Sequence, residues 1–176
     1  MTGPSEPGRF LSGVPAVALL ALCVLGPALA SCSAEGDGAA GRREVPYWDE
    51  RATPATVSER MGVTVPAGAA DRRAAHQHGF QDDGLLLAFT LPTAEVDAFV
   101  RRLRPERDLR TREEPRRDPV APATPFARLG LPEPDTLPRV LEGQVCAPCD
   151  GDLNALRVAV HQLGGDSSRV YLSAID

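Results

Sequence analysis

The sequence predicts an α+β domain, with a mostly antiparallel sheet of about four strands and one main amphipathic helix packed on it. Two observations indicate the strands: an apolar run at residues 85–91 directly after an acidic turn, and two apolar segments at 156–163 and 169–175 on either side of a Gly-rich loop. A helical pattern of apolar residues lies at 93–103. The predicted order is two hairpins separated by a helix and a long loop.

The first hairpin is predicted from residues 63–91. Asp82, Asp83 and Gly84 form a turn signal between a weakly patterned segment at 63–80 and the run LLLAFTL. The clear apolar run after this turn is predicted to be the second strand of the hairpin.

The helix at 93–103 follows directly. Thr93 is the expected N-cap, acidic residues occupy the first turn and arginines the last, as the helix dipole favours. The apolar side chains recur at i, i+3, i+4 and i+7, and they are Val96, Phe99, Val100 and Leu103. Burial of this stripe requires a sheet beside the helix.

Residues 104–125 are rich in Arg, Glu and Pro and are predicted to form a surface loop. Short helical turns broken by prolines are expected at 126–144. The second hairpin, at 156–175, then turns through the sequence GGDSS.

The N-terminal segment has the layout of a secretory signal peptide, with Arg9 near the start, then an apolar stretch and small residues. The apolar stretch at 14–30 contains Pro15 and Pro27 and is shorter than the roughly 20 apolar residues of a spanning helix. It is therefore a poor membrane anchor by itself.

Leu29, Ala30, Ser31 and Cys32 resemble the lipobox of bacterial lipoproteins. The resemblance implies cleavage after residue 31, a diacylglycerol on Cys32, and attachment to the outer face of the cell membrane through this lipid. All 19 basic residues are Arg, and the chain also resembles short lipoproteins of high-GC actinobacteria. The alternative is an ordinary secretory signal that is cleaved near the same place.

We expect three parts: the signal peptide at 1–31, a flexible tether at 32–60 and a single α+β domain at 61–176. Tyr47 and Trp48 are the bulky apolar pair of the tether, and they either dock on the domain or contact headgroups or a partner. A formal net charge of −5 argues against a nucleic-acid partner, because such proteins need a basic face.

Cys146 and Cys149 form the motif CAPC. Since Cys23 is lost with the signal and Cys32 is lipidated, an exported chain is expected to join these two remaining cysteines in a structural disulfide. The motif also resembles the redox centre of the thioredoxin family, which keeps open a thiol-disulfide oxidoreductase or a metal site. The acidic residues that follow, Asp150 and Asp152, would raise a thiol pKa and disfavour redox work.

Three histidines are candidate zinc ligands. His76 and His78 lie two apart and point to one face of a strand, and His161 lies on another predicted strand. They would give a metal-dependent hydrolase if they met, but no known metal-binding spacing supports the cluster, and the sequence predicts no metal and no cofactor. The nearby sequence DGDLN begins like a calcium loop but lacks the required later ligands, so a turn is expected there.

The segment 101–117 carries many arginines that could contact anionic headgroups or wall polymers. Acidic residues are interleaved with them, so a solvated loop with internal ion pairs is the favoured interpretation.

No motif of a catalytic nucleophile or phosphate-binding loop is found. The sequence therefore favours a non-catalytic, membrane-anchored binding or accessory module, with a possible protein or cell-wall partner. An enzyme is the less favoured class, either an oxidoreductase using the cysteines or a hydrolase using the histidines.

Overall fold

A computed structural model describes residues 44–176. The predicted signal peptide, Cys32 and the first part of the predicted tether lie outside the described residues. Among the helices of residues 44–176, none has the length and apolar character needed to cross a bilayer.

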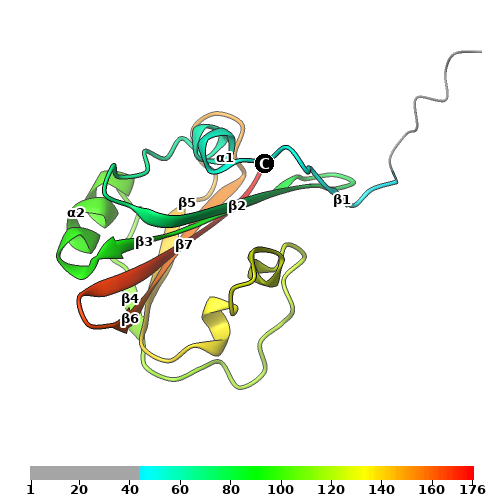
Figure 1. Cartoon of the computed structure of the whole chain (residues 1–176). Coiled ribbons are helices and arrows are strands. Elements are labelled where there is room, and N and C mark those ends of the chain that lie inside the picture. The colour runs from blue at the N-terminus through cyan, green and yellow to red at the C-terminus, as the bar shows by residue number, and fades with distance from the viewer. Residues whose placement is uncertain (1–43) are drawn as a thin grey trace, which may run out of the picture. The chain divides into compact units, whose positions relative to one another are not determined.

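The described residues build one seven-stranded antiparallel sheet in the order β1-β2-β3-β7-β6-β5-β4 (Figure 1). The prediction of an α+β domain with about four strands and one main helix is therefore wrong, because the fold is mostly β. The strands are β1 (Tyr47–Trp48), β2 (Ala70–His78), β3 (Gly84–Pro92), β4 (Arg110–Arg112), β5 (Val140–Cys146), β6 (Ala155–Gly164) and β7 (Ser167–Ile175).

The strands that the sequence did not predict have weak local signals. β1 and β4 contain only two and three residues, and they form because a longer neighbour offers free hydrogen-bonding groups. β5 carries Gly143 and Gln144 in its middle and follows a proline-rich segment, so its apolar alternation is poor. Pairing with β6 compensates for this weak propensity.

The two predicted hairpins are joined at the centre of the sheet. β3 pairs along its whole length with β7, from Gly84 opposite Ile175 to Pro92 opposite Ser167. Both strands are buried on both faces, which accounts for the continuous apolar run in β3.

Helix α2 (Thr93–Leu103) confirms the predicted helix and its buried face. Phe99 is 1% exposed and meets Phe89 edge-on, with ring centroids 5.3 Å apart. Thr93 is not the cap: it is the first helical residue, and its hydroxyl lies 2.9 Å from that of Ser168 on β7. Pro92, the last residue of β3, occupies the N-cap position, and its side chain makes no capping hydrogen bond.

Helix α1 (Pro54–Arg60) and β1 lie within the stretch 32–60 that was predicted as a tether. Thr53 and Thr56 form a reciprocal capping box, Pro54 opens the helix, and Val57 is 2% exposed. The folded part therefore starts before residue 61. Tyr47 and Trp48 dock on the domain through the pairing of β1 with β2.

The two faces of the sheet have different covers (Figure 1). α1 and α2 cover one face, over a core that includes Leu85, Leu87 and Phe89 of β3. The long segment 113–139, with the short 3-10 helices η1 (Phe126–Leu129) and η2 (Pro134–Thr136), covers the other face. We call it the covering segment; the sequence had predicted a surface loop and broken helical turns there.

Candidate functional site

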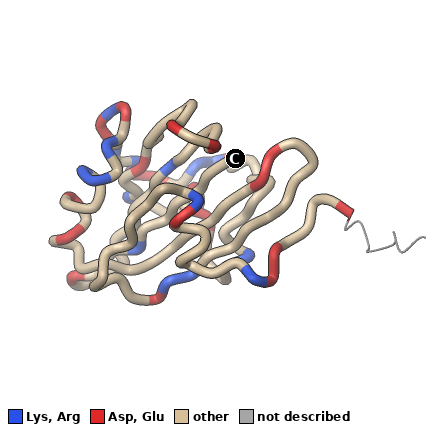
Figure 2. The backbone as a smooth tube through the Cα atoms, turned by 90° about the horizontal axis from the view of Figure 1, so that it is seen from above, with Lys and Arg blue, Asp and Glu red and all other residues tan. Residues whose placement is uncertain are grey.

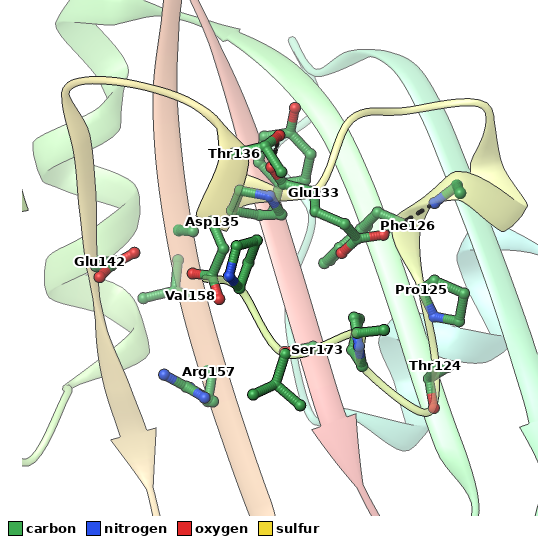
Figure 3. A pocket seen from close by; sticks show the side chains of 18 of the residues that line it. Thr124, Pro125, Phe126, Glu133, Asp135, Thr136, Glu142, Arg157, Val158 and Ser173 are labelled. Atoms are coloured by element: carbon green, nitrogen blue, oxygen red, sulfur yellow. Dashed lines mark hydrogen bonds between the residues drawn. The ribbon is translucent and has the colours of Figure 1, made fainter. Parts of the chain in front are cut away.

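A cavity of about 420 Å³ lies between the covering segment and strands β5, β6 and β7 (Figure 3). Prolines and alanines of residues 119–127 form much of its outer wall, and residues 133–136 form one end. Its size is within the range of small-molecule pockets, roughly 300–1,000 Å³.

Proline content explains why this segment arches over the sheet instead of joining it. Pro119, Pro122 and Pro125 lack the N–H group that a strand needs, so the chain runs across the face of the sheet without pairing. The space left between this arch and the strands is the cavity.

Arginines of the segment 101–117 hold the arch in place. Arg112 on β4 donates hydrogen bonds to the carbonyl oxygens of Pro134 and Leu137, at 2.7 and 2.8 Å. Arg116 pairs with Asp135 at 2.8 Å. These contacts give part of the arginine-rich segment a structural role, in line with the internally paired interpretation.

Figure 2 shows basic and acidic positions interspersed along the described chain. Glu142 on β5, for example, lies between Arg112 and Arg116, at 3.2 and 2.7 Å. The carboxylates at this end of the cavity are thus already paired with arginines.

Glu133 differs from the other acids of the cavity, Asp135 and Glu142, because within the described part of the chain it is not paired with an arginine. Burial raises the pKa of its carboxyl group, although Glu133 Oε1 accepts a hydrogen bond from the backbone N–H of Ala127 at 3.1 Å. This hydrogen bond ties η2 to η1, so the side chain supports the shape of the arch.

Three donors on the strands face the cavity. In the sheet register Arg157 on β6 lies opposite Ser173 on β7, and Ala159 lies opposite Tyr171, so all four side chains share one face. Within residues 44–176, the side chains of Arg157, Ser173 and Tyr171 make no hydrogen bond or ion pair. Burial raises the pKa of the Tyr171 phenol, so its hydroxyl stays protonated at neutral pH. The cavity therefore combines apolar walls with hydrogen-bond donors that have no partner.

The cysteines lie on the other face of the sheet. Cys146 and Cys149 form a disulfide with a Cα–Cα distance of 4.9 Å, which confirms the predicted pairing. Both pack against the core beneath the helices and do not line the cavity.

The predicted cluster of three histidines does not form. His76 and His78 are neighbours on β2, with ring centroids 4.0 Å apart. His161 lies on β6, and β3 and β7 separate these two strands. Sequence order alone could not show that the two hairpins meet through β3 and β7, which places the histidines apart.

The DGDLN stretch is a turn, as expected. Gly151 has a positive φ of 84°, and the side chain of Asn154 donates a hydrogen bond to Asp82 Oδ1 at 3.1 Å. β6 begins at the next residue, Ala155.

Comparisons of the sequence with protein-family profiles and with characterised proteins, and of the fold with solved structures, give no significant match. The sequence analysis missed Arg157, Tyr171 and Ser173, although the two-residue alternation of the second hairpin places them on one face.

Proposed function

We propose that this chain is an exported protein, anchored by a lipid on Cys32 to the outer face of the cell membrane, whose folded part binds a small amphipathic molecule. The ligand has an apolar body and an anionic head. The lipobox-like sequence at residues 29–32 supports the anchor. The cavity between the covering segment and the sheet supports the binding role.

The observation that carries the proposal is the set of unpaired donors beside apolar walls. An anionic head would accept hydrogen bonds from Arg157, Ser173 and Tyr171, while the apolar body would contact the prolines and Phe126. A cationic head would instead meet the exposed guanidinium of Arg157. The carboxylates of Asp135 and Glu142 are already paired with Arg116, and burial raises the pKa of Glu133.

A binding role explains the arrangement of Arg157, Ser173 and Tyr171 without a catalytic step. Within residues 44–176 the hydroxyl of Ser173 makes no hydrogen bond to a side chain that could act as its base, and the residues that line the cavity include no histidine or cysteine. A serine nucleophile needs an adjacent general base.

Three probes with the same apolar body test the proposal: 4-phenylbutyrate, 4-phenylbutanol and 4-phenylbutylamine. Binding is measured by titration calorimetry on the full chain in lipid nanodiscs, with empty nanodiscs subtracted. We expect the anion to bind most tightly and Arg157→Gln to weaken it ~10-fold, because a charge-assisted hydrogen bond contributes about 1.5 kcal/mol.

Arg107→Gln is the matched control, because Arg107 is exposed and lies outside the cavity. It should leave the affinity for 4-phenylbutyrate unchanged. Equal affinity for the three probes, or an anion affinity that Arg157→Gln does not change, would refute the proposal.

A further inference from the structure

A second cluster of polar side chains lies at the opposite face and edge of the sheet, where β1 meets β2. His76 pairs in register with Leu85, a residue of the core beneath the helices, whereas the cavity lies on the side of Tyr171. The backbone N–H of Asp49, just after β1, donates to the carbonyl oxygen of His76 at 2.8 Å. This hydrogen bond brings the carboxylate of Asp49 beside the two imidazoles of His76 and His78.

The three side chains lie close enough together to share one metal ion. One ligand atom from each of Asp49, His76 and His78 lies within 4.8 Å of those of the other two. Two imidazoles and one carboxylate form a donor set that suits a divalent transition metal such as zinc, with a further coordination position left for water.

Asp83 holds both imidazoles. Its Oδ2 atom lies 2.7 Å from His76 Nε2 and 3.0 Å from His78 Nδ1. Because a carboxylate only accepts hydrogen bonds, each of these nitrogens donates, and each neutral imidazole keeps a lone pair on its other nitrogen. Metal-binding histidines characteristically donate their second N–H to a carboxylate in this way.

Asp83 is itself fixed in place. The backbone N–H of Gly79 donates to its Oδ1 atom at 3.2 Å, and its own N–H and carbonyl exchange hydrogen bonds with Asp176. The carboxylate that orients the imidazoles is therefore positioned by the hairpin turn and by the end of β7.

The charge around the cluster favours a cation. Two arginines lie at the cluster. The guanidinium of Arg60 contacts the carboxylate of Asp176 and lies 3.7 Å from Asp83 and 3.4 Å from His76 Nε2, and Arg51 Nε, on an exposed side chain, lies 3.5 Å from Asp49 Oδ1. Three carboxylates, those of Asp49, Asp83 and Asp176, thus stand against two guanidiniums, which leaves an excess of negative charge. A divalent ion would neutralise the excess negative charge.

The cluster is open to solvent on one side. His76 is 5% exposed, whereas the side chains of His78 and Asp83 are 29% and 23% exposed. An ion can therefore reach the buried imidazole from the side of His78.

We propose that Asp49, His76 and His78 bind one divalent transition-metal ion of the zinc class, and that Asp83 is a positioning residue for the two histidines. Asp49 takes the place that the sequence analysis had considered for His161. The disulfide leaves Cys146 and Cys149 without thiolates that could compete for the ion.

The test is a titration of Zn²⁺ into the full chain, purified without a histidine tag, followed by calorimetry. Visible absorption of the Co²⁺ form provides a second readout, because it reports nitrogen and oxygen ligands and reveals thiolate if it is present. We expect one ion per chain and a spectrum without thiolate bands.

Asp49→Asn and His78→Gln change partly exposed ligands, and each is expected to weaken Zn²⁺ binding by 10-fold or more. Asp83→Asn is expected to weaken it by roughly 10–100-fold, the usual effect of losing an outer carboxylate, with no matching loss of melting temperature in the metal-free chain. His161→Gln is the matched control and should bind as the unchanged chain does.

Absence of one-to-one binding would overturn the proposal. So would binding that survives in both Asp49→Asn and His78→Gln, or binding that His161→Gln removes. If one of these two variants does not fold, the Zn²⁺ affinity of the other variant tests the proposal.

Discussion

The ring of Phe126 meets the ring of Tyr171 edge-on, with centroids 5.0 Å apart and ring planes at 88°. Phe126 belongs to η1 in the covering segment, and Tyr171 belongs to β7 in the centre of the sheet. This contact therefore joins the arch to the floor of the cavity.

Phe126→Ala should lower the free energy of unfolding by ~3 kcal/mol, because it removes a buried aromatic side chain and its contact with Tyr171. It should also weaken 4-phenylbutyrate binding, since the wall of the cavity loses its attachment. Denaturant titration measures the first effect. Phe80→Ala is the control, because Phe80 is 87% exposed, and an equal loss in both variants would contradict the prediction.

Phe99→Ala should cost ~3–5 kcal/mol of unfolding free energy, because Phe99 fills the space between α2 and Phe89. Asp97→Ala, on the exposed side of the same helix, should change stability little. A melting temperature of Phe99→Ala equal to that of the unchanged chain would show that α2 does not depend on this contact.

Asp71→Asn tests a charge pair at the start of β2. Asp71 lies 2.8 Å from the guanidinium of Arg169, which is buried, and two other nitrogens of that guanidinium have no hydrogen-bond partner within residues 44–176. Loss of the carboxylate leaves the buried guanidinium of Arg169 without its counter-charge, so the free energy of unfolding at pH 7 should fall by about 2 kcal/mol. The effect is smaller than for a fully buried pair because Asp71 is partly exposed.

The same pair predicts a pH dependence. A hydrogen bond from Arg73, together with the charge of Arg169, holds the pKa of Asp71 below its ordinary value of 3.8. The stabilisation is therefore present above pH 3.8 and is lost as the pH falls through the lowered pKa of the folded chain. Unfolding free energies measured from pH 7 to pH 2 should fall less in Asp71→Asn; parallel curves for the two chains would exclude this role.

Replacement of both Cys146 and Cys149 by serine should cost ~2 kcal/mol, because a ring closed over so few residues removes little entropy from the unfolded chain. The far-ultraviolet circular dichroism spectrum should be unchanged, since β5 and β6 pair independently of the disulfide. Complete unfolding of the double variant would contradict this prediction, because it would show that the disulfide stabilises the whole fold and not only the local turn.

Cys32→Ser should release the protein from the membrane into the medium, or leave it uncleaved, because serine cannot carry the thioether-linked lipid. Cell fractionation with immunodetection measures this. Cys23→Ser is the matched control and should stay in the membrane fraction. Retention of cleaved Cys32→Ser at the level of the unchanged chain would contradict the lipid anchor.

Local patterns in the sequence were sufficient for several elements. The stripe through Phe99 predicted α2, the acidic turn and apolar run predicted β3, and the closely spaced cysteines of the CAPC motif predicted the disulfide. In each case neighbouring residues carry the signal, through helical period, turn chemistry or spacing.

The tertiary structure alone decided the number of strands, the cover of the second face and both candidate sites. β1 and β4 are stabilised by pairing with strands far along the chain, and β5 by pairing with β6, more than by their own propensity, so their sequences carry little signal. The meeting of β3 with β7 separates His161 from His76, and hairpin and edge contacts instead place Asp49 and Asp83 beside His76. Such contacts depend on the order of strands in the sheet. No local pattern specifies that order, because packing of the whole core decides which distant strands pair.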